Sequence, residues 1–326
     1  PLTQLLLIVI MTNTLMFTFL SASVSYDNLT NLLAVMAIYY MCAFFKERSG
    51  DFLLLSILCQ LVGCLTKKTF LPLALILCLL LVIREFRSVP GFPAVLFRYL
   101  KTEGRTGLVL VFVVSVGLAM NIHLYGGNLL QYGSLQPQIT EALSFDAAMQ
   151  NRLGAEYFIF DKYKNWEVSY EEVLEMSSVI NNDGDRSDLI ILIQNFELRK
   201  YQGETLMSPL EFILPWSQRM LVSVYGIIGH VSMFNEGFAI LPIVALLALA
   251  CLSSPFCLHF RDAAGIPVCL AIIASFYVVT LMAVNYTGAY QYFESFGVSI
   301  QGRYIFPVMG PLVVLFCYSL LHLFGE

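Results

Sequence analysis

Ser299-Ile-Gln-Gly-Arg-Tyr-Ile-Phe-Pro-Val-Met-Gly-Pro311 opens the last long apolar run of the sequence and places one arginine, Arg303, in its first turn. A guanidinium at a membrane boundary is costly unless it reaches the headgroups or finds an anionic partner. Its planar fork suits a phosphate or a carboxylate, so Arg303 is a ligand candidate. The simpler interpretation is that Arg303 only anchors the helix end to lipid headgroups.

The composition around this stretch is that of a polytopic membrane protein. Of 326 residues, 58% are hydrophobic and 13% are charged, about half of the roughly 25% charged residues of a typical soluble domain. The mean hydropathy is +0.75. The chain begins with Pro1 inside an apolar run, which predicts that it is a piece of a longer protein.

The apolar runs predict an all-α membrane fold with about eight transmembrane helices. Only helices and closed barrels satisfy the backbone in lipid, and these runs are continuous rather than alternating. Two of the runs are short for a bilayer that needs about 20 residues. The eight runs lie near 2–22, 28–45, 52–66, 69–83, 106–125, 237–254, 266–286 and 304–322.

The distribution of basic residues predicts the orientation of these helices. Short loops on the cytoplasmic side of a membrane protein are enriched in lysine and arginine. One side of the predicted bundle collects eight of them, whereas the short loops of the other side hold three. The cytoplasmic set is Lys46, Arg48, Arg84, Arg87, Arg98, Lys101, Arg105 and Arg261, and the outward set is Lys67, Lys68 and Arg303.

The long polar segment 126–236 is predicted to form a mainly helical extracytoplasmic cap. It holds fifteen acidic and seven basic residues. Residues 1–125 and 237–326 then form the N-terminal and C-terminal groups of transmembrane helices.

Within the cap, we expect amphipathic helices at 139–152, 169–180 and 187–200. The Ser-Tyr-Glu-Glu sequence that begins at Ser169 has the pattern of a capping box. Residues 209–230 are apolar but interrupted, which indicates an interfacial helix. Trp216 is expected to anchor that helix at the interface, and Trp166 to lie in the core of the cap.

Metal-binding and nucleotide-binding motifs are not recognisable in the sequence. The eight cysteines lie in or beside apolar runs without the spacing of zinc ligands, and the four histidines are scattered. No metal site and no nucleic-acid partner are predicted.

Three short motifs resemble the membrane region of the GT-C glycosyltransferase superfamily. They are Ser25-Tyr-Asp-Asn28 at the start of one helix, Leu65-Thr-Lys-Lys68 between two short helices, and Gln301-Gly-Arg-Tyr304 before the last helix. The likeness covers nearly the whole chain. It is closest to a bacterial family of polytopic membrane proteins of unassigned function, and more distant to aminoarabinose and protein-mannose transferases.

The resemblance implies an integral protein of the bacterial cytoplasmic membrane that acts in the cell envelope. Its donor would be a polyprenyl-phosphate-linked sugar, and its acceptor a glycan or a lipid on the extracytoplasmic face. The cofactor stays open, with a divalent cation as one alternative. In this family a carboxylate of the first outer loop acts as base or metal contact, and here the helix and loop that should carry it would precede Pro1. Either that element is missing from the chain, or the chain keeps the architecture without the activity.

Asp27, Glu236 and Glu294 are the outward acids nearest to membrane ends, and Asp27 alone matches a family position. It is the candidate for a catalytic carboxylate, although helix N-capping is its simpler role. Arg303, Lys67, Lys68 and Tyr304 are the candidates for binding the lipid phosphate, with Lys67 preferred over Lys68. The alternative function is that of a non-catalytic polytopic protein or transporter that binds a lipid-linked or other solute.

Overall fold

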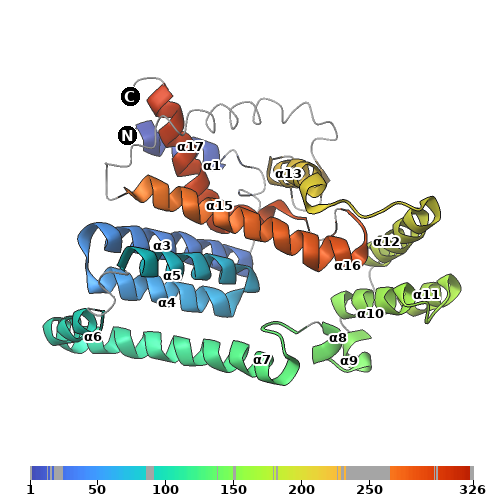
Figure 1. The fold of residues 1–326 in the computed structure, drawn as a ribbon, viewed down its shortest axis with the longest axis horizontal. Helices are drawn as coiled ribbons and strands as arrows, with labels where there is room; N and C mark the ends of the chain where they lie inside the picture. The colour runs from blue at the N-terminus through green and yellow to red at the C-terminus, as the bar shows by residue number, and fades with distance from the viewer. Residues whose placement is uncertain are drawn as a thin grey trace. The chain divides into compact units, whose positions relative to one another are not determined.

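The computed structural model describes residues 2–12, 14, 17, 25–85, 92–137, 139–149, 152–178, 180, 183–225, 227–228, 231–232, 265–296, 298 and 300–323. These residues are mainly helical (Figure 1), and they divide into two compact units. Unit 1 comprises 1–120, 213–283 and 300–326, and unit 2 comprises 121–212 and 284–299.

The first half of the described chain contains α-helices, one 3₁₀ turn and one π-helical turn. They are α1 (Leu2–Thr12), α3 (Tyr26–Glu47), α4 (Gly50–Thr66), the 3₁₀ turn η1 (Lys68–Phe70), α5 (Leu71–Glu85), α6 (Phe92–Asn121), the π-helical turn η3 (Ile122–Gly126), α7 (Gly127–Tyr132), α8 (Ile139–Ala142), α9 (Phe145–Met149) and α10 (Arg152–Lys164). The helix α6 is kinked at Gly104, where φ is +56°.

The second half adds the remaining helices and one short hairpin. They are α11 (Tyr170–Ser177), α12 (Asp183–Gln202), α13 (Pro209–Tyr225), the strands β1 (Ile227–Ile228) and β2 (Val231–Ser232), α15 (Ile266–Val284), the π-helical turn η6 (Asn285–Tyr290), α16 (Gln291–Phe293), the 3₁₀ turn η7 (Gly302–Val308) and α17 (Met309–Leu323). The two strands pair antiparallel, with Ile227 opposite Ser232.

Four helices of the described residues are long and apolar enough to cross a membrane. They are Tyr26–Glu47, Gly107–Tyr132, Ile266–Phe293 and Gly302–Leu321, and Gly50–Thr66 is a shorter apolar helix. This supports a membrane protein. Eight spans are not confirmed: α1 covers Leu2–Thr12 of the predicted run 2–22, most of whose remainder lies outside the described residues, as does the predicted run 237–254.

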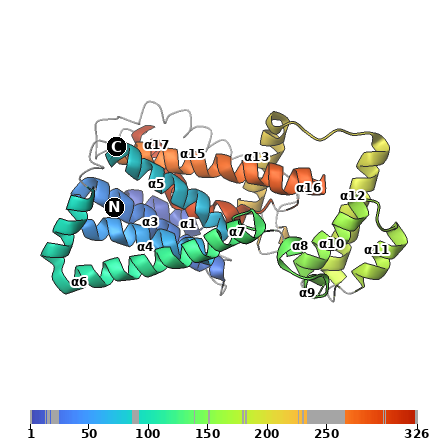
Figure 2. The ribbon, with the colours of Figure 1, turned by 60° about the horizontal axis from the view of Figure 1, so that its bottom comes forward.

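Unit 1 is built on the α3–α4 hairpin, whose two helices lie side by side in both ribbon views (Figures 1 and 2). The hairpin turns sharply because Arg48 ends α3 in the left-handed conformation, with φ at +58°. In its core, Ser56 Oγ donates a 2.8 Å hydrogen bond to the carbonyl of Ala37 and accepts one from Gln60. Polar bonds of this kind join helices in an apolar environment, where packing alone provides little drive.

Unit 2 contains a core shared by α10, α11 and α12 together with residues of η6 and α16. Phe160, Ile159, Val173 and Ile193 are fully buried there, and Phe293 packs on Phe160 with ring centroids 5.1 Å apart. The predicted cap helices correspond to α8 and α9, α11 and α12, and Ser169 and Glu172 form the predicted capping box.

The two tryptophans do not follow the sequence expectation. Trp166, expected in the core of the cap, is 77% exposed because it follows α10 in a left-handed backbone conformation with φ at +61°. Trp216, expected as an interface anchor, is 4% exposed and buried within unit 1.

Candidate functional site

Asp27 lies in the first turn of α3 and is 4% exposed. The expectation that it caps this helix is wrong, because Ser25 is the N-cap and its side chain accepts a hydrogen bond from the Asp27 backbone N–H. Since Ser25 takes the capping role, the Asp27 carboxylate is left to bond elsewhere. Its negative charge still lies at the positive end of the helix dipole.

Lys67 is the C-cap of α4 and lies at the same end of the α3–α4 hairpin as Asp27. Its backbone N–H donates to the carbonyl of Gly63, at 3.0 Å. The chain can turn tightly here because Gly63 has no side chain: a Cβ at this position would lie 2.4 Å from the ring of Phe70. Gly63 and Phe70 therefore fix the place of Lys67.

The Asp27 carboxylate pairs with both Lys67 and Arg303. Lys67 Nζ donates a hydrogen bond to Oδ1, and Arg303 Nη1 lies 3.6 Å from Oδ2. The side-chain exposures are 5% for Asp27, 14% for Lys67 and 34% for Arg303. Burial lowers the pKa of the Lys67 ammonium, and the bond to Asp27 opposes this shift. We call Asp27, Lys67 and Arg303 the charged triad.

Arg303 is placed by the glycine that precedes it. A Cβ on Gly302 would lie 2.6 Å from the backbone of Ser223 and Val224, so only glycine allows η7 to approach α13 this closely. The Arg303 Nε and Asp27 Oδ2 are both buried and have no hydrogen-bond partner among the described residues. Unsatisfied buried polar atoms are costly and are rare in folded proteins. The Arg303 side chain as a whole is 34% exposed, so the accessible part of the guanidinium can meet a further anion.

Two tyrosine rings complete the surroundings of Lys67. Its Nζ lies 4.8 Å from the ring centroid of Tyr304 and 5.1 Å from that of Tyr26, and Arg303 Cζ lies 5.5 Å from the Tyr304 ring. Cations are attracted to aromatic faces at these distances. Tyr304 thus contacts both cations, and Tyr26, which is 60% exposed, borders the charged triad.

Tyr277 of α15 joins the two segments that carry the cations. It is 1% exposed, and its hydroxyl lies 3.1 Å from the carbonyl of Thr69 and 3.0 Å from that of Tyr304. The hydroxyl can donate one hydrogen bond at a time, so the two carbonyls share its proton. Tyr277 was not predictable from the sequence, because one tyrosine in an apolar run carries no signal for contacts this distant in sequence.

The other candidate residues do not join the charged triad in the described part of the chain. Lys68 is exposed and forms no ion pair with Asp27. Glu294 belongs to unit 2, where it pairs with Arg199, Lys164 and Lys200. Glu236 lies outside the described residues.

The charged triad carries one net positive charge, from two cations and one carboxylate. Such a site, at the end of apolar helices, can hold an anion of the phosphate class through the arginine fork and the lysine point charge. Over the described ranges, no group of three or more histidine, cysteine or acidic residues has the arrangement of a metal site.

The chain was also compared with known proteins. No protein-family model matches it, and no curated protein or solved structure is significantly similar to it.

Proposed function

We propose that the protein is a membrane glycosyltransferase of the GT-C type that binds a polyprenyl-phosphate-linked sugar, with the lipid phosphate on Arg303 and Lys67. The observation that supports this most is the pairing of two cations on one buried carboxylate, with the Arg303 side chain left 34% exposed. This arginine lies in the first turn of the 20-residue, mainly apolar segment Gly302–Leu321, so it would meet a lipid phosphate at the membrane surface.

The two cations suit the chemistry of such a transfer. An acceptor hydroxyl attacks the anomeric carbon, the bond from that carbon to the phosphate oxygen breaks, and the polyprenyl phosphate leaves with the bonding electrons. Negative charge develops on the leaving phosphate, and fixed cations in a partly dehydrated site stabilise it best. Arg303 and Lys67 would stabilise this leaving group, with Tyr304 holding both cations in place.

Asp27 is better suited to position the cations than to act as the catalytic base. A general base must come within hydrogen-bond reach of the hydroxyl it deprotonates. One Asp27 oxygen is engaged by Lys67, and the other is buried. In this proposal Asp27 is a positioning residue, and the base comes from another group.

The buried Asp27 also favours a second candidate function. A site with two cations and no accessible carboxylate can bind a lipid phosphate without catalysing transfer. The protein would then be a non-catalytic polytopic protein or transporter for a lipid-linked solute.

A transfer assay separates the two candidates. The complete protein, in nanodiscs, is given polyprenyl-phosphate-linked sugars with a labelled sugar and an envelope extract as acceptor, and Lys68→Gln serves as a matched control. We expect transfer that Arg303→Lys abolishes and Lys68→Gln preserves. Binding of the lipid phosphate without transfer would establish the second function, and absence of both would refute the proposal.

A further inference from the structure

Trp166 occupies a position where proteins usually place glycine. Its N–H bonds to the carbonyl of Tyr163 at 3.0 Å, and the N–H of Glu167 bonds to the carbonyl of Lys162 at 2.9 Å. These two bonds define a Schellman motif at the end of α10, with Trp166 at its left-handed residue. A bulky side chain in this conformation costs about 1–3 kcal/mol.

Folding does not explain why a tryptophan stands at this position. Its indole is 77% exposed and contacts the Tyr163 ring in a tilted arrangement, with centroids 6.5 Å apart. A strained residue with a large exposed apolar surface is typical of a binding site. The indole is therefore available to a ligand.

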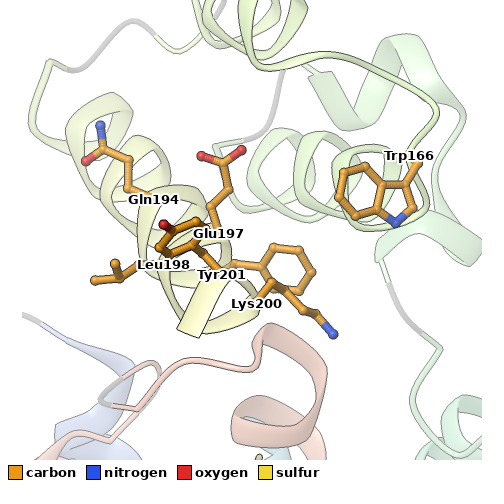
Figure 3. A pocket seen from close by; sticks show the side chains of 7 residues that line it. Trp166, Gln194, Glu197, Leu198, Lys200 and Tyr201 are labelled. Carbon is orange, nitrogen blue, oxygen red and sulfur yellow. The ribbon is translucent and has the colours of Figure 1, made fainter. Parts of the chain in front are cut away.

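The indole borders a cavity of about 630 Å³ (Figure 3), within the range of about 300–1,000 Å³ for small-ligand sites. The other wall is the C-terminal part of α12, where residues spaced three and four apart share one face. Tyr201 is 91% exposed and Leu198 is 53% exposed on this wall. The remaining lining residues are Gln194, Phe196, Glu197 and Lys200.

Several polar groups of the cavity are held in place. Tyr163 Oη donates a hydrogen bond to one Glu197 oxygen, which leaves the second oxygen as an acceptor. Gln194 Nε2 donates to Tyr170 Oη at 3.1 Å, which leaves its amide oxygen unused in that bond. Lys200 is half-exposed, and its Nζ lies 5.3 Å from the Phe196 ring.

We propose that this cavity binds an uncharged saccharide unit, stacked on Trp166 and Tyr201 and hydrogen-bonded by Glu197, Gln194 and Lys200. A sugar ring presents an apolar C–H face to an aromatic ring, and hydroxyl groups around its edge. Planar carboxylate and amide groups beside flat aromatic rings match both features. The proposal rests on the cavity in unit 2 alone and does not depend on the proposed transfer reaction.

The charges of the lining favour a neutral ligand. Glu197 and Lys200 contribute one negative and one positive charge, so the cavity attracts neither cations nor anions as a class. Lys200 Nζ already lies 3.3 Å from Glu294 Oε2, and Glu197 and Gln194 each make one hydrogen bond. An apolar ligand would cover the remaining proton positions of Lys200, the second Glu197 oxygen and the Gln194 amide oxygen without bonding to them, at a desolvation cost. A polyhydroxylated ring satisfies all three groups.

The test uses the fluorescence of Trp166 in the 326-residue chain with Trp216→Phe, which removes the second of its two tryptophans. The probes are triacetylchitotriose, mannotriose, cellotriose and galactotriose, which are all uncharged. We expect at least one trisaccharide to shift the emission saturably and to protect Trp166 from oxidation by N-bromosuccinimide. Absence of both effects with all four probes would overturn the proposal.

Binding of the effective probe by isothermal titration calorimetry then identifies the residues. Trp166→Gly should weaken binding roughly tenfold or more, as loss of one aromatic stacking partner does elsewhere. The same variant should be at least as stable as the parent, because glycine adopts the left-handed conformation without strain. Ile191→Ala, on α12 outside the cavity, is the matched control and should bind normally. Loss of stability without loss of binding in Trp166→Gly would contradict the proposal.

The saccharide could be free or lipid-linked. Titration of the same trisaccharide as a polyprenyl-phosphate conjugate in nanodiscs distinguishes the two sources: equal affinity indicates a free glycan, and higher affinity a lipid-linked one. Arg303→Lys should leave binding of the free trisaccharide unchanged, so failure of this site and failure of the phosphate site are distinguishable.

Discussion

Neutralising Asp27 should destabilise unit 1, because the Lys67 ammonium loses its counter-charge. The Asp27 and Lys67 side chains are 5% and 14% exposed, so Asp27→Asn leaves a nearly buried ammonium without its counter-charge. Breaking a buried ion pair costs about 3–5 kcal/mol. Because the Tyr26 and Tyr304 rings still contact Lys67, we expect a loss of about 2–4 kcal/mol in the free energy of unfolding.

A double-mutant cycle with Lys67→Met isolates the pair. The double variant removes both charges, so its loss should be smaller than the sum of the single losses, with a coupling energy of about 2 kcal/mol. Lys68→Met is the matched control: Lys68 is exposed and makes no ion pair with Asp27, so the variant should stay within about 0.5 kcal/mol of the parent.

The assay is reversible unfolding in mixed micelles, followed by fluorescence of the buried Trp216 in a Trp166→Phe background. Trp216 lies in unit 1 and therefore reports the unit that holds the charged triad. A coupling energy below about 0.5 kcal/mol would refute the reasoning, because pairs in contact couple more strongly than this.

Three further substitutions test how the site is positioned and how unit 2 responds to pH. Tyr277→Phe removes the hydroxyl that lies between two backbone carbonyls. It should lower the free energy of unfolding by about 1 kcal/mol, measured by thermal unfolding, and should weaken polyprenyl-phosphate binding several-fold, measured by titration. Gly302→Ala forces a Cβ against the backbone of α13 and should abolish that binding, whereas Gly127→Ala, which has open space, should not. The hydrogen bonds from Ser169 lower the pKa of Glu172, so unit 2 should lose stability as the pH falls through this lowered pKa. Glu172→Gln should remove this part of the acid dependence, measured by circular dichroism in a pH titration.

The sequence predicted the α3–α4 hairpin well because its signals are local. The runs 28–45 and 52–66 correspond to α3 (Tyr26–Glu47) and α4 (Gly50–Thr66), since polar and basic residues bound a continuous apolar stretch. The capping box at Ser169 was predictable for the same reason. In contrast, α10 was missed: its apolar residues 157–160 form one short run between charged residues, without the spacing of an amphipathic helix, and its core partner Phe293 is more than a hundred residues away.

The candidate site was predictable in its residues but not in its geometry. Lys67 and Arg303 were recognisable because they break the charge bias of the loops that the sequence predicts to face outward. That Asp27 would pair with both cations depends on Ser25 taking the cap and on Gly302 packing against α13. Such contacts depend on the tertiary structure, and no local pattern encodes them.

The most direct test of the central claim is the affinity of the protein in nanodiscs for polyprenyl phosphate, with the uncharged polyprenol as the reference ligand. We expect the parent and Lys68→Gln to bind polyprenyl phosphate more tightly than polyprenol. Arg303→Lys, which keeps the charge but loses the bidentate fork, and Lys67→Gln should each lose most of that difference. If both of these variants bind polyprenyl phosphate as tightly as the parent, Arg303 and Lys67 are membrane anchors and the phosphate site does not exist.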